Sequence, residues 1–118
     1  MSADQIHYFL QLRDQLKLYH WQTRVYARHI ATDNSLQSLE KSIDSYVEIY
    51  IGKYGRPKMN GKNSSITLHN LSEAGASRML IAAVKYLQKI NTPDTDLMSI
   101  RDDMIGDINQ LLYLFTLK

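Results

Sequence analysis

The residues that interrupt helices are concentrated in two places, and this distribution constrains the fold more than any other feature. Gly52, Gly55, Pro57 and Gly61 fall in one segment, and Pro93 marks a second break. Glycine and proline are the least favourable residues in a helix interior. The stretches between these breaks show no strand-like alternation of apolar and polar residues. The sequence therefore predicts an all-α fold with breaks near residues 52–61 and 93.

Apolar residues in the long stretches recur at three- and four-residue steps, which is typical of amphipathic helices. The first helix is expected to begin at residue 3 or 4, the third to cover about 71–90 and the fourth about 95–117. The predicted buried residues are Phe9, Leu12, Leu16 and Tyr19 in the first helix, and Leu97, Ile100, Met104, Ile108, Leu111 and Phe115 in the fourth.

The end of the first helix is open to two interpretations. The run from Thr32 to Ser35 has the composition of a helix N-cap, so the first helix could end at about Ala31 and the second begin there. Alternatively, the chain turns near residues 23–25 and the second helix runs on to about Tyr54. We favour the second interpretation, because it gives one long buried seam. That seam consists of Leu36, Leu39, Ile43, Tyr46, Val47 and Tyr50.

The segment from Gly52 to Asn70 is loop-like and unusually long. Fully extended, residues 55–70 could span roughly 50 Å, whereas a helix of about 28 residues is about 42 Å long. Such a loop can cross a whole bundle, as ferritin-like topologies require between their second and third helices. We therefore expect residues 1–118 to form one domain, a ferritin-like four-helix bundle with a long crossover between helices 2 and 3.

Composition excludes several classes of function. The 118 residues include no cysteine, which excludes disulfides and thiolate metal sites. A net charge of +2 gives no general reason to expect nucleic acid or an anionic membrane as partner. No stretch reaches the length of a membrane span, and the N-terminus lacks the pattern of a signal peptide. The expectation is a soluble, intracellular (cytoplasmic) protein with no membrane partner.

Two pairs of polar residues suggest a metal site. His29 and Asp33, and likewise Asp44 and Glu48, are four residues apart, which places each pair on one helix face, one turn apart. Nitrogen and oxygen donors at this spacing are how helical proteins hold metal ions. His29 and Asp44 are 15 residues apart, about 22 Å along one helix, so they cannot bind one ion within one chain. Two copies packed antiparallel about a twofold axis would form two identical sites, which predicts a homodimer at least.

These residues resemble motifs of the Dps-like ferritins, a branch of the ferritin-like superfamily. In that family a His-Trp pair ends the first helix, and His-x3-Asp/Glu and Asp-x3-Glu motifs follow on the second. As in the family, the Asp of the second motif lies 11 positions after the acid of the first. The matching residues, in about a third of the chain, are His20, Trp21, His29, Asp33, Asp44 and Glu48.

The resemblance implies that iron(II) is bound and oxidised at a mononuclear or dinuclear site in the dimer interface, commonly with peroxide, by subunits of a twelve-subunit cage. It implies that His20 completes the ligand set and that Trp21 lies near the iron. The spacing from His20 to His29 is shorter than usual in the family, and the lysine-rich N-terminal arm of some members is missing. The stretches at residues 19–23 and 54–56 are also similar to small uncharacterised helical proteins of large viruses and phages.

Other features suggest weaker alternatives. Trp21 is expected to pack in the core or in an interface. Four basic residues on the crossover could contact phosphate, which makes nucleic-acid binding a third hypothesis, although nucleic acid is not the expected partner. The second hypothesis is a non-enzymatic helical module for oligomerisation or partner binding. The absence of Glu-x-x-His excludes a di-iron site inside the bundle. The basic residues are Lys53, Arg56, Lys58 and Lys62.

Overall fold

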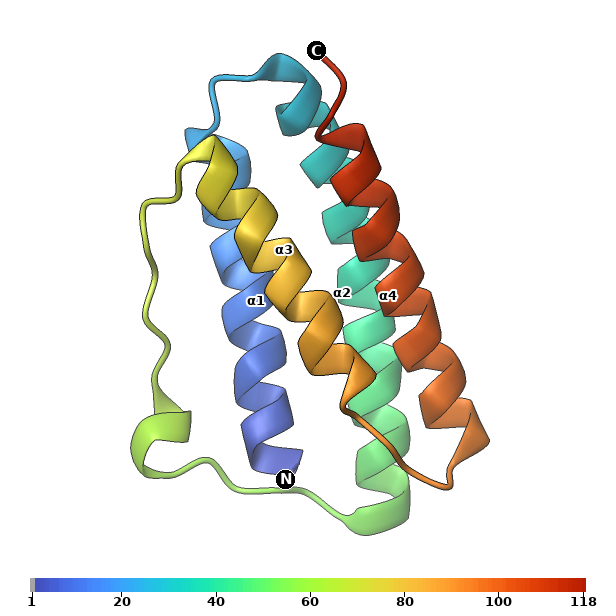
Figure 1. Ribbon diagram of the computed structural model, residues 1–118. Helices are drawn as coiled ribbons and strands as arrows, with labels where there is room; N and C mark the ends of the chain where they lie inside the picture. Colours follow the sequence, from blue (N-terminus) through green and yellow to red (C-terminus); the bar gives the residue numbers. More distant parts are fainter. Residues whose placement is uncertain (1) are drawn as a thin grey trace.

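The computed structural model describes residues 2–118, and all regular secondary structure in this range is helical (Figure 1). The prediction of an all-α bundle of four helices is confirmed. None of the helices in residues 2–118 is both long and apolar enough to cross a membrane. The elements are α1 (Ser2–Gln22), α2 (Tyr26–Tyr54), the 3₁₀ turn η1 (Gly61–Ser64), α3 (Glu73–Gln88) and α4 (Thr95–Leu114).

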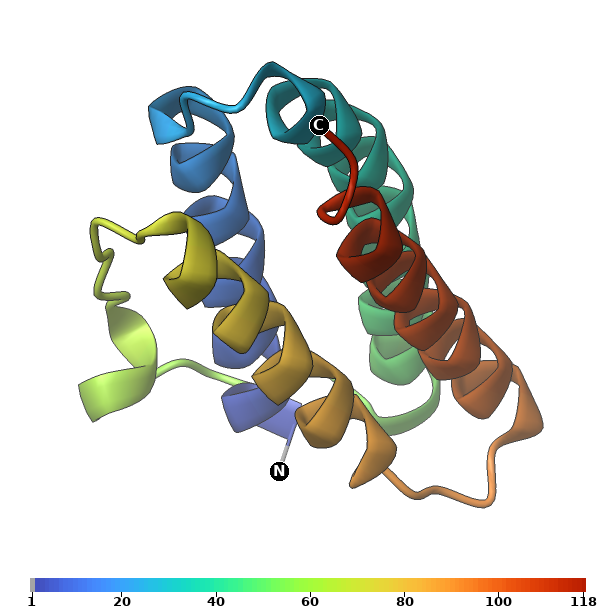
Figure 2. The same cartoon turned by 45° about the horizontal axis from the view of Figure 1, so that its top comes forward.

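The four helices are arranged so that every neighbouring pair is antiparallel. In Figure 1, α1 and α4 run upward, whereas α2 and α3 run downward. Both α1 and α4 pack against α2 and α3, and the two parallel pairs, α1 with α4 and α2 with α3, lie on the diagonals within residues 2–118 (Figure 2). The 29 residues of α2 are about 43 Å long at 1.5 Å per residue, so α2 extends along the whole 43 Å length of the molecule.

The connection from α2 to α3 returns along the outside of α1, from one end of the bundle to the other (Figure 1). It is held there by the buried side chain of Gln15. The Gln15 Nε2 group donates to the carbonyl of His69, and the His69 N–H donates to Gln15 Oε1, each over 2.8 Å. Nearer the start of α1, His7 Nε2 lies 2.7 Å from the carbonyl oxygen of Ser65. These contacts thus fix the long crossover to the outside of α1.

The core contains the residues that the spacing predicted. All four predicted residues of the first helix are buried, and so are all those of the fourth except Ile100, which is partly buried. In the predicted seam of α2, Val47 and Tyr50 are partly buried and the others are buried. The third helix adds a narrower face that consists of Ala76, Leu80, Ala83 and Leu87.

The chain turns between α1 and α2 at residues 23–25, which confirms the favoured interpretation. The alternative N-cap at Thr32 is wrong. Thr32 lies inside α2 and is fully buried, and its hydroxyl donates to the carbonyl of Arg28 over 2.8 Å. Inside a helix, a threonine hydroxyl can donate a hydrogen bond to the carbonyl four residues earlier. Residues that favour an N-cap therefore do not require that a helix begin at this point.

Two helices are shorter than expected. The third begins at Glu73 because Ser72 caps it: the N–H of Gly75 donates to Ser72 Oγ over 2.9 Å. The fourth ends at Leu114 rather than at residue 117, and the buried ring of Phe115 closes that end of the core.

Candidate metal centre

The three-residue turn brings His20, near the end of α1, against His29, in the first turn of α2. Their rings stack, with 4.1 Å between centroids and 13° between planes. His20 is only 5% exposed, whereas His29 is half-buried. In one unbroken helix these residues would point in opposite directions, because nine residues at 100° each amount to about half a turn beyond two full turns. The turn therefore creates the pair.

Hydrogen bonds determine which nitrogen of each ring carries the proton. The hydroxyl of Thr32 gives its only proton to a backbone carbonyl, so its oxygen accepts from His20 Nδ1, 2.8 Å away. His29 Nδ1 lies 2.9 Å from the carbonyl oxygen of His20, which can only accept. Both Nδ1 atoms are therefore donors, and in the neutral form of either ring the lone pair lies on Nε2. This is how ligating histidines are commonly oriented in metal sites.

The surroundings favour the uncharged form of His20. Burial lowers the pKa of His20 below its ordinary value, and the charges of His29 and Lys17 lower this pKa further. Asp33 acts on the same pKa in the opposite direction. A neutral imidazole can donate its lone pair, whereas an imidazolium cannot.

Asp33 lies one turn after His29 on the outer side of α2 and is exposed. It lines a shallow groove between α1 and α2, together with Arg13, Lys17 and Glu40. The guanidinium of Arg13 lies 3.5 Å from the carboxylate of Glu40 across this groove. Asp33 therefore lies on the outer face of the α1–α2 pair, one turn along α2 from His29.

Asp44 and Glu48 are also exposed on α2, but farther along the helix. Because α2 is unbroken from Asp33 to Asp44, Asp44 lies about 16 Å beyond Asp33 along the helix axis. Within residues 2–118, no three side chains of His, Asp or Glu are close enough together to hold one metal ion. One chain thus brings His20 and His29 together, with Asp33 one turn away, and leaves the second acidic pair apart.

Trp21 is 67% exposed, so within one chain it does not pack in the core as one alternative expected. The Nζ atom of Lys17 lies 5.3 Å from the centroid of its ring. Tyr26 is 75% exposed, with its ring 6.3 Å from that of His29, and Ile30 is 44% exposed one turn later. We refer to these three exposed side chains, Trp21, Tyr26 and Ile30, as the apolar cluster; Trp21 follows His20 in the chain, and Tyr26 lies in the same first turn of α2 as His29.

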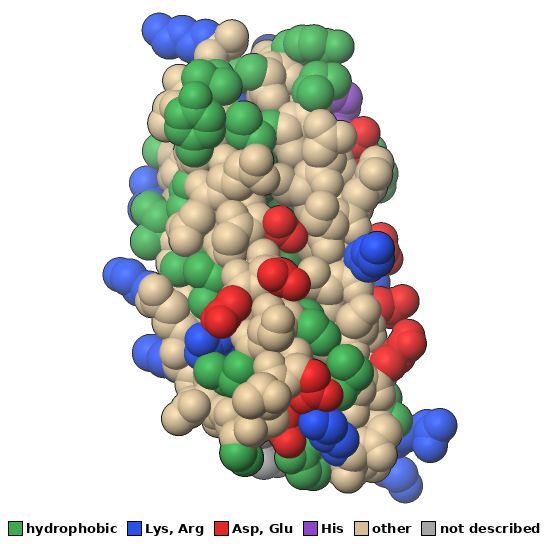
Figure 3. Space-filling view, turned by 90° about the vertical axis from the view of Figure 1, so that its right-hand side faces the viewer, with side chains coloured by type: hydrophobic (Ala, Val, Ile, Leu, Met, Phe, Trp, Pro, Cys, Tyr) green, Lys and Arg blue, Asp and Glu red, His purple; other side chains and the backbone are tan. Residues whose placement is uncertain are grey.

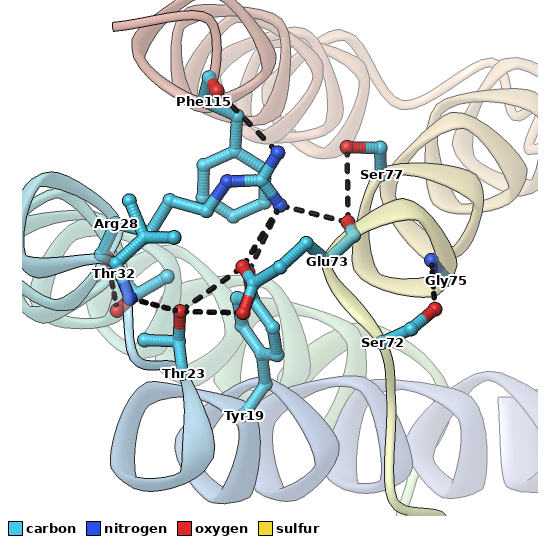
Figure 4. A network of polar contacts seen from close by, with 10 residues as sticks. Tyr19, Thr23, Arg28, Thr32, Ser72, Glu73, Gly75, Ser77 and Phe115 are labelled. Atoms are coloured by element: carbon cyan, nitrogen blue, oxygen red, sulfur yellow. Dashed lines mark hydrogen bonds and ion pairs between the residues drawn. The ribbon is translucent and has the colours of Figure 1, made fainter. Parts of the chain in front are cut away.

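A polar network at the same end of the bundle joins all four helices (Figure 4). The carboxylate of Glu73 accepts from the hydroxyls of Tyr19 and Thr23, the latter over 2.9 and 3.0 Å. Arg28 donates to the carbonyl of Glu73 over 2.7 Å and lies 3.4 Å from its carboxylate. The guanidinium carbon of Arg28 lies 4.2 Å from the centroid of the Phe115 ring. This network fixes the turn that carries the histidines.

Sequence reasoning missed the network because its members are far apart along the chain. Glu73 lies 54 residues after Tyr19 and 45 after Arg28. Helical periodicity relates residues only three or four positions apart. No local pattern could therefore pair these residues.

The four basic residues of the crossover do not form one free patch. Lys53 lies in the last turn of α2, and its Nζ atom is 3.3 Å from a carboxylate oxygen of Asp94 and 2.8 Å from one of Asp96. Its charge is thus compensated within the chain. The other three, Arg56, Lys58 and Lys62, are exposed on the crossover.

A second polar groove lies between α2 and α4, on the face shown in Figure 3, where acidic side chains gather. Burial raises the pKa of Asp107 above its ordinary value, and the nearby charge of Asp103 adds to this. The two carboxylates therefore repel each other, and the residues that line this groove include no histidine that could serve as a nitrogen ligand. The groove is lined on α4 by Asp102, Asp103 and Asp107, and on α2 by Ser38, Lys41, Ser42 and Ser45.

Comparison with known proteins gives one match. The sequence model of DUF5856, described as a family of unknown function, matches residues 20–115. No curated protein and no solved structure matches the chain. The matched range includes every residue of the candidate metal centre.

Proposed function

We propose that this chain, which belongs to the DUF5856 family of unknown function, is a Dps-like protein that binds iron(II) and oxidises it at a homodimer interface. The observation that carries the proposal is the stacked pair of His20 and His29, in which both Nδ1 atoms are donors and both Nε2 atoms are left as ligands. Imidazole nitrogens combined with carboxylate oxygens form a donor set that suits iron(II).

The arrangement of the helices supports the ferritin-like part of the proposal. Antiparallel neighbours and a long crossover between the second and third helices are the features of a ferritin-like bundle. The crossover passes along the outside of α1, from one end of the bundle to the other (Figure 1).

The dimer follows from the length of α2. Asp44 and Glu48 cannot reach the histidines of their own chain, so in the proposed site they come from the second copy. An antiparallel crossing of two α2 helices supplies both sites by symmetry. Covering the apolar cluster on association would also remove exposed aromatic surface from water, which favours such an interface. A twelve-subunit cage would be built from such dimers.

In the proposed reaction iron(II) is the substrate. Two iron(II) ions each give one electron to one molecule of hydrogen peroxide, which takes up two protons and leaves as two molecules of water. The two histidines bind and orient the substrate through Nε2. The carboxylates of Asp33, Asp44 and Glu48 balance its positive charge, and Trp21 limits access of water from one side.

The test is anaerobic titration with iron(II), followed by peroxide, while the absorbance of ferric iron and the mass in solution are recorded. The double substitution Asp44→Ala/Glu48→Ala is expected to abolish binding and fast oxidation. Asp102→Ala/Asp103→Ala is the matched control, because it removes the same charge from the face of α4. A folded oligomer of the unsubstituted protein that binds no iron would contradict the proposal.

The apolar cluster also favours a second candidate function, a non-enzymatic module that associates with itself or another helical protein. Such a module would be indifferent to a chelator, and its association would survive Asp44→Ala. Nucleic-acid binding through Arg56, Lys58 and Lys62 is the weakest candidate, because Lys53 is already paired. It would show a steep dependence of affinity on salt concentration.

A further inference from the structure

We propose that Thr32 is a positioning residue whose hydroxyl holds His20 in the tautomer protonated on Nδ1, so that Nε2 is available to a divalent cation. The cation part of this inference rests on the proposed function. The tautomer part rests only on contacts within the chain.

The first step is the direction of the hydrogen bonds at Thr32. Its single hydroxyl proton has two candidate acceptors, the carbonyls of Arg28 at 2.8 Å and His29 at 3.1 Å. Both are oxygens that only accept, so the proton is used in either case. The oxygen of Thr32 can then only accept from His20 Nδ1 at 2.8 Å.

The second step is that Thr32 provides the side-chain acceptor for this proton, at 2.8 Å, while the backbone carbonyl of His29 also acts on the His20 ring and raises its pKa. Both side chains are buried, with Thr32 at 0% and His20 at 5% exposure. Every buried side-chain nitrogen or oxygen in residues 2–118 has a hydrogen-bond partner. A buried donor that loses its acceptor is costly, which is why the ring would change its protonated nitrogen instead.

The third step is that Thr32 is itself held in place. The carbonyl that takes its proton belongs to Arg28, whose side chain is bound to Glu73 and covers Phe115 (Figure 4). The position of the hydroxyl is therefore tied to the meeting point of all four helices. The histidine pair is oriented by the bundle rather than by the α1–α2 turn alone.

The informative substitution is Thr32→Val, which keeps the shape and removes the hydroxyl. It removes the side-chain acceptor of the buried Nδ1 proton of His20, so the Nδ1–H tautomer loses this support and the ring should move its proton to Nε2. That nitrogen then has no lone pair for a cation. Loss of such an orienting partner typically lowers metal affinity about 10–100-fold. Thr32→Ser keeps the hydroxyl and should retain both the tautomer and the affinity.

The experiment measures ¹⁵N chemical shifts of the histidine rings and, on the same samples, titration with zinc(II) as a redox-inert probe. We expect His20 Nδ1 to be protonated in the unsubstituted protein and in Thr32→Ser, and Nε2 to be protonated in Thr32→Val. Thr92→Val is the matched control, because it removes a partly buried threonine hydroxyl that bonds Asp94 at the opposite end of the bundle. It should lower stability without changing the tautomer or the affinity for zinc(II).

Two results would overturn the inference. One is an Nε2-protonated His20 in the unsubstituted protein, a measurement that needs no variant to fold. The other is a Thr32→Val protein that keeps both the Nδ1–H tautomer and full zinc(II) affinity. Failure of the proposed function is distinguishable, since iron oxidation could be absent while the tautomer and zinc(II) affinity still depend on Thr32.

Discussion

The ring of His20 lies on the ring of His29 across the turn from α1 to α2, with 4.1 Å between their centroids. Two imidazolium ions cannot stack this closely without strong repulsion, so at least one ring is neutral. The one that burial keeps neutral is His20, whose pKa is lowered. The neutral His20 ring therefore has a free lone pair on Nε2 that is available to a cation.

Mixing two inactive variants should restore part of the iron oxidation if the site is shared between chains. Asp44→Ala/Glu48→Ala keeps its histidines, and His20→Ala/His29→Ala keeps its acidic pair. Half of the dimers in an equal mixture are mixed, and one of the two sites in each has all native ligands. We expect about a quarter of the unsubstituted rate after subunit exchange, from the statistics of a twofold dimer.

The measurement is the rate of ferric absorbance increase after the two variants are unfolded and refolded together. Each variant refolded alone is the control and should stay inactive. A mixture no more active than its components, in which mass spectrometry nevertheless finds mixed dimers, would place the ligands within one chain or exclude the site.

Arg28→Met should destabilise the bundle although Arg28 itself belongs to no predicted seam. The substitution removes the hydrogen bonds to the carbonyl of Glu73 and to the Tyr19 hydroxyl, and leaves both polar groups partly buried. We expect the free energy of unfolding to fall by about 2 kcal/mol, as for a lost charged hydrogen bond. Arg24→Met, at an exposed position in the adjacent turn, should change it by less than about 0.5 kcal/mol. Urea unfolding measures both.

Acid should weaken the contact between the end of α2 and the start of α4. The hydrogen bond from Tyr54 lowers the pKa of the Asp94 carboxyl most, followed by those from Thr92 and Lys53. Because the folded pKa lies below the unfolded value of about 3.9, this contribution is complete above that value and is lost as pH falls through the folded pKa.

Asp94→Asn should therefore remove part of the decrease in stability below about pH 4. Tyr54→Phe removes the largest cause of the shift and should raise the pKa of Asp94 only part of the way. Unfolding followed by circular dichroism between pH 2 and 6, with NMR titration of the carboxyl, checks both. An Asp94 that titrates at its ordinary pKa in the folded protein would refute the expectation.

Two glycines at the end of α2 should respond to alanine with opposite signs. Gly55 ends the helix at φ 90°, where a side chain is strained, so Gly55→Ala should cost about 1 kcal/mol. Gly52 lies inside the helix, and a Cβ added there meets nothing within 4 Å. Gly52→Ala should stabilise by about 0.5–1 kcal/mol through helix propensity. Thermal unfolding of the two variants side by side tests the pair of signs.

The sequence alone determined the features that depend on local periodicity. The spacing of Phe9, Leu12 and Leu16 predicted a buried helix face, and the glycines and prolines predicted where helices stop. The long segment after Gly55 predicted the crossover. These predictions succeeded because each depends on residues within one or two turns of each other, whose relative placement a helix fixes.

Only the tertiary structure decided which distant side chains meet. Thr32 lies in a run with the composition of a helix N-cap, yet packing buries it inside α2. There its hydroxyl oxygen accepts a hydrogen bond from His20 Nδ1. Lys53 looked like part of a phosphate patch, yet the turn before α4 places two carboxylates against it. Glu73 showed no signal in the sequence, although it binds three other residues of the network. Contacts between residues tens of positions apart depend on how helices pack, and no local pattern encodes that.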